Sequence, residues 1–219
     1  MGRSAMDAVE NPGRERILQR IRNALSASTP AAAGSEAEIF PLIPDEITRF
    51  SSECAANHTE LVLTGNELQA AHAVAKVLSE TPEGEIFMQD APSLRRLAET
   101  CSLQRTILWS NAGGPTENAQ ASITLAEALV AQTGSILVSS ACGGRSATVA
   151  APVHVVVAWR SQLVPDLKTL FSRVSRDERI MKNSMLCLTT GSSRTGDIEK
   201  ILVLGAHGPR RLVVVLQSD

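Results

Sequence analysis

From residue 39 onward, short apolar runs alternate with segments in which apolar residues recur every three or four positions. The apolar runs predict strands at residues 60–64, 85–89, 105–110, 135–140, 154–159, 184–190, 200–205 and 211–217. The recurring spacing predicts helices at 66–80, 93–100 and 161–174, and residues 124–132 (TLAEALVAQ) predict a short helix or a turn. Because strands alternate with helices and several strands are apolar throughout, we expect an α/β fold. Its sheet should be mostly parallel and Rossmann-like, with helices on both faces.

The N-terminal segment differs from this pattern. Residues 11–28 (NPGRERILQRIRNALSAS) predict an amphipathic helix, with apolar residues at positions 17, 18, 21 and 25. Its four arginines form either a solvated face or a face that binds an anion or a partner. The Ala-, Pro-, Gly- and Ser-rich stretch that follows (STPAAAGSEAE) is typical of a flexible linker. We therefore expect two parts: residues 1–38, with the helix and linker, and an α/β domain over residues 39–219.

Composition narrows the possible functions of this 219-residue chain. The formal net charge is −2 and aromatic residues make up only 3%, without any Tyr, so a nucleic-acid-binding surface is not expected. No apolar run is long enough to insert into a membrane, and the N-terminus lacks the apolar core of a secretory signal. The four cysteines (Cys54, Cys101, Cys142, Cys187) are scattered and show no Cys-x-x-Cys spacing. We expect a cytoplasmic protein without a metal or cluster site, whose cysteines are small buried hydrophobes.

Two glycine-containing loops are candidate ligand sites. In AQTGS, the hydroxyl of Thr133 and the backbone at Gly134 can form a cradle for phosphate or carboxylate, and the same residues can equally form a tight turn. In ACGGRSATVAAP, the guanidinium of Arg145 can donate two hydrogen bonds to one anion. Alternatively, Arg145 is a surface arginine in a mobile loop and binds no ligand.

A third polar segment, TTGSSRTGDIEKILVLGAHGP, surrounds an apolar run with polar residues. If DIEKI begins a helix, free backbone N–H groups beside Ser193, Arg194 and Thr195 would bind an anion. Asp197 and Glu199 are candidates for acid–base catalysis, or for orienting the arginine. The flanking glycines Gly205 and Gly208 enclose His207, which is either a proton-transfer group or a capping residue of a turn.

This third segment resembles the C-terminal signature of the LUD domain, or lactate utilization protein C, family. The matching residues are Gly191, Ser193, Arg194, Thr195, Asp197, Ile198, Glu199, Gly205, His207, Gly208 and Pro209. Three other segments are also similar to the family. The family's Ala-x-Thr-Gly-Thr segment corresponds to EALVAQTGSILVSS, and its Arg and Pro-x-His segment corresponds to Arg145 with residues 152–157. The N-terminal helix of the family is similar to RERILQRIRNAL. The chain departs from the pattern at four positions, where Gln132 replaces a frequent Glu, Ser135 a Thr, Ser192 a Pro and Gly196 an Ala. An amide at position 132 can hydrogen-bond but cannot titrate.

The resemblance implies a fold similar to the ribose-5-phosphate isomerase and CoA-transferase group. It also implies a part in a cytoplasmic system that oxidises L-lactate to pyruvate, together with iron–sulfur partner proteins. This chain would hold no cluster itself and would bind a small anionic metabolite or cofactor of unknown identity. Two alternatives stay open: a stand-alone enzyme acting on a sugar phosphate or CoA ester, and a non-catalytic assembly subunit. The sequence also leaves open whether the chain forms a homo-oligomer.

Overall fold

The computed structural model describes residues 12–27, 39–196, 202–204 and 208–219. The chain divides into two compact units, residues 1–39 and 40–219. In the first unit, helix α1 (Pro12–Ala27) forms where the amphipathic pattern predicts a helix, and it exposes Ile17 and Ile21. Among the described helices, none is long and apolar enough to span a membrane.

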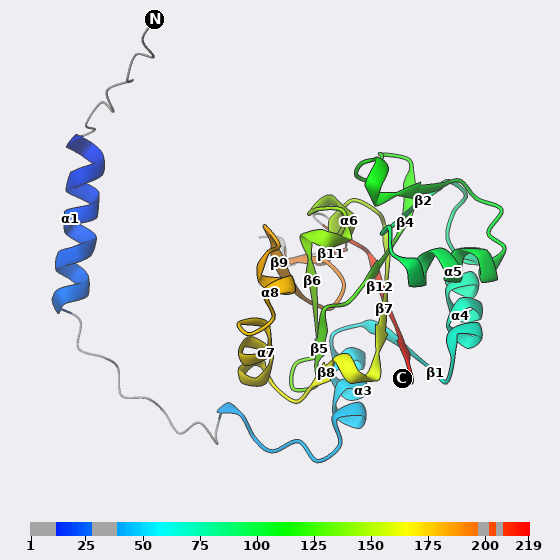
Figure 1. Cartoon of the computed structure of the whole chain (residues 1–219), viewed down its shortest axis with the longest axis horizontal. Coiled ribbons are helices and arrows are strands. Elements are labelled where there is room, and N and C mark those ends of the chain that lie inside the picture. Colours follow the sequence, from blue (N-terminus) through cyan, green and yellow to red (C-terminus); the bar gives the residue numbers. More distant parts are fainter. Residues whose placement is uncertain (1–11, 28–38, 197–201, 205–207) are drawn as a thin grey trace, which may run out of the picture. The chain divides into compact units, whose positions relative to one another are not determined.

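The second unit is built on a six-stranded sheet in which all neighbouring strands are parallel (Figure 1). In spatial order, the strands are β1 (Thr59–Thr64), β12 (Arg211–Gln217), β7 (Val153–Trp159), β4 (Ala119–Leu125), β2 (Glu85–Met88) and β3 (Ile107–Trp109). The central strands β7 and β12 are buried along almost their whole length. This burial explains their continuous apolar sequences, because both faces of the sheet are covered.

Helices α4 (Glu67–Ser79) and α5 (Pro92–Cys101) cover one face of this sheet. Their buried residues pack with the odd-numbered residues of β7 and β12, including Val155 and Val213. Helix α4 begins where the sequence predicts, because the side chain of Asn66 accepts a hydrogen bond from the backbone of Gln69. The expected α/β fold, with a mostly parallel sheet and covering helices, is confirmed.

The opposite face is covered by helix α3 (Glu46–Ala56) and by a second sheet that the pattern does not predict. Its strands, in spatial order, are β8 (Leu163–Val164), β5 (Ala128–Val130), β6 (Ser135–Ser139) and β9 (Leu186–Thr190). The pairs β5–β6 and β6–β9 are antiparallel. The short helices α7 (Leu167–Val174) and α8 (Glu178–Met181) pack with residues of this second sheet.

The expectation of a short helix or turn at residues 124–132 is wrong. This segment contains the end of β4 and the whole of β5. All three residues of β5 are buried, and the strand pairs with both β6 and β8. A short apolar run fits a buried strand as well as a buried helix, and here tertiary pairing decides.

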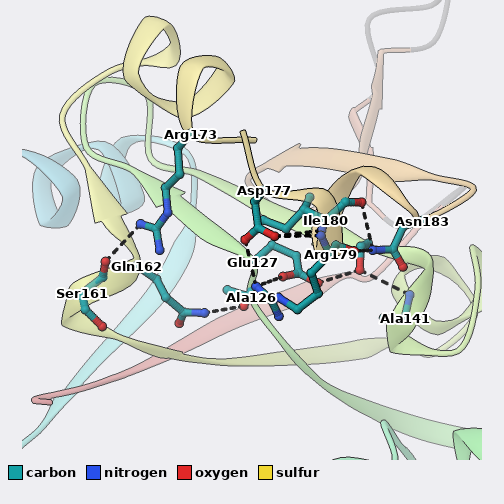
Figure 2. A network of polar contacts seen from close by, with 11 residues as sticks. Ala126, Glu127, Ala141, Ser161, Gln162, Arg173, Asp177, Arg179, Ile180 and Asn183 are labelled. Atoms are coloured by element: carbon teal, nitrogen blue, oxygen red, sulfur yellow. Dashed lines mark hydrogen bonds and ion pairs between the residues drawn. The ribbon is translucent and has the colours of Figure 1, made fainter. Parts of the chain in front are cut away.

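A network of polar contacts joins the second sheet to α8 (Figure 2). The Glu127 carboxylate accepts a 2.7 Å hydrogen bond from Ser139 Oγ and pairs with Arg179 at 3.5 Å. Asp177 caps α8 by accepting from the backbone N–H groups of Arg179 and Ile180. Because Glu127 directly precedes β5, this network ties α8 to the bend between the two sheets.

A buried histidine lies inside the six-stranded sheet. His154 of β7 is 2% exposed, and its Nε2 lies 2.8 Å from Thr124 Oγ1 on β4. Its Nδ1 has no hydrogen-bond partner in the described chain. Burial lowers the pKa of His154 from its ordinary value of 6.5 to about 4, because the charged imidazolium would lose its hydration.

This depressed pKa predicts a pH-dependent stability. Between pH 6.5 and pH 4, His154 is protonated in the unfolded chain but stays neutral in the folded chain. The free energy of unfolding therefore decreases as the pH falls from 6.5 toward 4. The loss at pH 5 is about 2 kcal/mol, and it vanishes above pH 7. We expect His154→Gln, which cannot titrate, to remove this component. Urea unfolding of both proteins at pH 7 and pH 5 measures it, and equal pH dependence would contradict the prediction.

Candidate functional site

A pocket of about 460 Å³ lies at the amino-terminal edge of the six-stranded sheet, and we call it the amino-edge pocket. Part of its wall comes from residues that precede the adjacent strands β1, β12 and β7. The remainder comes from the end of β9 and the loop that follows it. The lining residues are Ala56, Asn57, Thr148, Val149, Thr189, Thr190, Gly191, Ser192, Ser193, Gly208 and Pro209.

The wall of the amino-edge pocket is rich in hydroxyl groups and carries no formally charged residue among those described. Five of its residues are Ser or Thr, and Asn57 adds a carboxamide. Hydroxyl groups both donate and accept hydrogen bonds. The pocket can therefore hold a small polar ligand, while compensation of a ligand's full charge requires a group outside this wall.

A chain of hydroxyl groups connects the first and third polar segments of the sequence. Thr133 Oγ1 lies 2.7 Å from Ser135 Oγ, and Ser135 Oγ lies 2.5 Å from Thr190 Oγ1. Ser135 and Thr190 stand opposite each other in the β6–β9 pairing, and Ser135 is only 2% exposed. These contacts link the turn between β5 and β6 to Thr190 in the pocket wall.

The turn that contains Thr133 and Gly134 is held against the end of α3. The side-chain amide of Asn57 donates to the carbonyls of Glu53 at 2.9 Å and Thr133 at 3.1 Å. Gly134 has a φ of +67°, and a Cβ at this position would lie 2.9 Å from the Cβ of Glu53. The structure places both predicted residues in a tight turn between β5 and β6, outside the pocket lining.

Two other predicted residues meet in the pocket wall. The backbone N–H of Ser193 donates to the carbonyl of Pro209 at 2.9 Å, and a Cβ added to Gly208 would lie 2.9 Å from that of Ser193. The beginning and the end of the third polar segment are thereby brought together. A residue larger than glycine at position 208 would push Ser193 from its place.

The remaining predicted residues fall into two groups. Arg145 is exposed at the N-terminus of α6 (Ser146–Val149) and does not line the pocket, although Thr148 and Val149 of that helix do. Arg194 and Thr195 lie in β10 (Arg194–Gly196), which pairs with β11 (Leu202–Leu204). Their side chains, together with the residues Asp197, Glu199, Gly205 and His207, lie outside what the structure describes.

The sequence analysis missed Asn57 and the role of Thr190. Asn57 ends α3, and an Asn at a helix end is a common local feature that does not by itself indicate a site. Its contact with Thr133 spans 76 positions, so no local pattern indicates it. Thr190 belongs to a predicted strand, and only the pairing of β9 with β6 brings it beside Ser135.

Cys54 and Cys142 are buried, as expected, whereas Cys101 and Cys187 are only partly buried. Burial raises the pKa of Cys54 to about 12 and that of Cys142 to about 11, which keeps both thiols protonated at neutral pH. Across the described ranges, no three His, Cys, Asp or Glu side chains come together in a way that could hold a metal ion.

The chain is similar to one family model and to several proteins that share one name. Residues 115–217 match the family model of the LUD domain. Over 181 residues the chain is 27% identical to "Lactate utilization protein C" of Halalkalibacterium halodurans, a match that covers 77% of each chain. It is 26% identical over 194 residues to the protein of the same name in Bacillus subtilis, which covers 80% of this chain and 79% of the relative.

A solved structure supports the same fold. A DUF162 family protein from Deinococcus radiodurans superimposes with a TM-score of 0.62 and 20% sequence identity. The match covers 81% of this chain and 99% of the other. At this level of identity the similarity concerns the fold alone.

Proposed function

We propose that the chain serves in lactate utilization, because residues 115–217 match the LUD domain model and the names of its relatives say this of those proteins. More specifically, we assign it to a cytoplasmic system that oxidises L-lactate to pyruvate. The amino-edge pocket would bind a small carboxylate in this system. The observation that carries the assignment is that Gly191, Ser193 and Gly208, all from the family signature, line one hydroxyl-rich pocket.

The pocket chemistry is compatible with such a ligand. L-lactate has a carboxylate and a hydroxyl group, and both can hydrogen-bond to the Thr and Ser hydroxyl groups of the wall. The side-chain N–H groups of Asn57 already donate to the Glu53 and Thr133 carbonyls. A carboxylate also needs a positive charge when it leaves water. Arg194 follows Ser193 directly in the chain, so we assign it as the principal cation, with Thr195 beside it and Arg145 as a second candidate.

The proposed reaction defines what this chain supplies and what it does not. Oxidation of L-lactate to pyruvate removes two electrons and two protons. We assign the electrons to iron–sulfur partner proteins. His207, with Asp197 or Glu199 to orient it, would accept one proton, and the other would pass to solvent. This chain would otherwise contribute binding and positioning.

Lactate-dependent dye reduction in extracts of lactate-grown cells tests this function. We expect activity to fall to background when the gene is deleted and to return when the purified chain is added. Iron–sulfur proteins should copurify with the tagged chain. Activity that persists without the chain, with no copurifying iron–sulfur protein, would contradict the proposal.

A further inference from the structure

The outer edge of strand β9 is open, and we call it the β9 edge. Strand β9 pairs with β6 on one side, and within the described ranges no strand pairs with its other side (Figure 1). The pairing with β6 continues from Leu186 to Thr190 without a shift in register. An open strand edge presents unpaired N–H and C=O groups to which another strand can bind.

The register with β6 shows which backbone groups face the β9 edge. The N–H of Ser140 donates to the carbonyl of Met185 at 2.9 Å, so these opposite residues form a hydrogen-bonded pair. In an antiparallel ladder, hydrogen-bonded and non-hydrogen-bonded pairs alternate. Leu186, Leu188 and Thr190 therefore form non-hydrogen-bonded pairs with β6. Their N–H and C=O groups point away from β6, toward the β9 edge.

The β9 edge also carries an apolar surface. Leu188 stands opposite Leu137, which packs with α7 and α8, and opposite residues share one face of a sheet. Leu186, two positions away, lies on the same face. Leu186 and Leu188 are nevertheless 38% and 39% exposed, and Met181 of α8 is 55% exposed. The two helices thus cover the other strands of this sheet and leave the leucines of β9 in contact with water.

The sequence of this strand does not oppose pairing with another strand. Natural proteins protect open edges with charged residues, proline or a bulge. Residues 184–190 (SMLCLTT) contain no charged residue and no proline, and the ladder has no bulge. Two copies of the segment can therefore face each other, because they bring no like charges together.

We propose that two copies of this chain associate through their β9 edges. A two-fold axis at Leu188 makes the two strands antiparallel and sets Leu186 of each copy opposite Thr190 of the other. All outward-facing residues then form hydrogen-bonded pairs, the two sheets become one continuous sheet, and the exposed leucines are buried. Thr190 also lines the amino-edge pocket, so the interface reaches that pocket in each copy. The interface does not depend on the lactate function and is tested without a ligand.

Leu188→Lys tests the interface on the full chain. Because Leu188 is partly exposed, a lysine can keep its methylene groups on the sheet and its ammonium group in water, so each copy should stay folded. In the dimer the two ammonium groups would meet at the two-fold axis. We expect sedimentation velocity at micromolar concentration to show a dimer for the wild type and a dimer weakened by at least about tenfold for the variant.

Leu63→Lys is the matched control. It places the same charge on an exposed leucine of β1, which is the edge strand of the six-stranded sheet. We expect this variant to dimerise as the wild type does. A mixture of Leu188→Lys and Leu188→Glu should form a heterodimer, because opposite charges then meet at the axis, although neither variant dimerises alone.

Amide hydrogen exchange reports on the pairing itself. The N–H groups of Leu186 and Leu188 point away from β6, so they should be protected in the wild-type dimer and exchange rapidly in Leu188→Lys. A monomeric wild type, a dimer that Leu188→Lys leaves intact, or rapid exchange of these amides in the wild-type dimer would overturn the proposal. Protection that arises only when a different protein binds would assign the β9 edge to that protein and would also overturn it.

Discussion

Replacing Arg194 with alanine is expected to weaken the binding of pyruvate to the amino-edge pocket by about 2–5 kcal/mol, without unfolding the protein. The described residues of the pocket wall carry no formal charge, so the carboxylate depends on a cation supplied by its surroundings. Arg194 follows Ser193, which lies in the wall. Isothermal titration calorimetry with pyruvate measures the loss, and urea unfolding checks that the fold is kept.

Two further variants separate a specific effect from a general loss of positive charge. Arg176 is exposed between α7 and α8, away from the pocket lining, so Arg176→Ala should bind pyruvate as the wild type does. Arg194→Lys keeps the charge and loses the planar two-pronged donor, so its affinity should be intermediate. Unchanged pyruvate affinity in Arg194→Ala would remove this residue from the ligand site.

Replacing Gly191 with alanine is expected to lower the free energy of unfolding by about 2–4 kcal/mol. Gly191 has a φ of +77°, a conformation that residues with a Cβ rarely adopt. An added Cβ would also overlap the backbone carbonyl oxygen of Asn57, and the loop would have to move. Because Asn57 also holds Thr133, the displacement should spread from the pocket wall to the β5–β6 turn.

Gly144→Ala is the matched control for this prediction. Gly144 also has a positive φ, +91°, but an added Cβ would meet nothing within 4 Å. It should cost only the backbone strain, about 1 kcal/mol. Urea unfolding of both variants measures the difference. Equal destabilisation would show that the contact with Asn57 does not constrain the loop.

Patterns along the chain predict most of the parallel sheet. The continuous apolar runs at β7 and β12 indicate strands buried on both faces, and Asn66 marks the beginning of α4. In the second sheet the pattern predicts strands at β6 and β9 but misses β5, whose three buried residues were expected in a helix or turn. Strands this short are stabilised by their pairing partners, and pairing between distant segments leaves no signal in either sequence alone.

The residues of the candidate site likewise fall into those that the sequence indicates and those that only strand pairing brings together. The polar segments rich in Gly, Ser and Thr are enough to indicate Ser193 and Gly208, and the pocket wall contains both. The predicted turn at Thr133 and Gly134 is connected to that wall through Ser135 and Thr190, a link that depends on strand register.

By itself, the sequence determined the fold class, the N-terminal helix, and the family signature that identifies the polar segments worth testing. These features depend on local periodicity and on short motifs, which are properties of neighbouring residues. Only the tertiary structure decided that Gly191, Ser193 and Gly208 of this signature lie together at the amino-terminal edge of the six-stranded sheet. The edge at which a residue lies depends on strand order and crossover connections, which are set by packing between segments far apart in the chain.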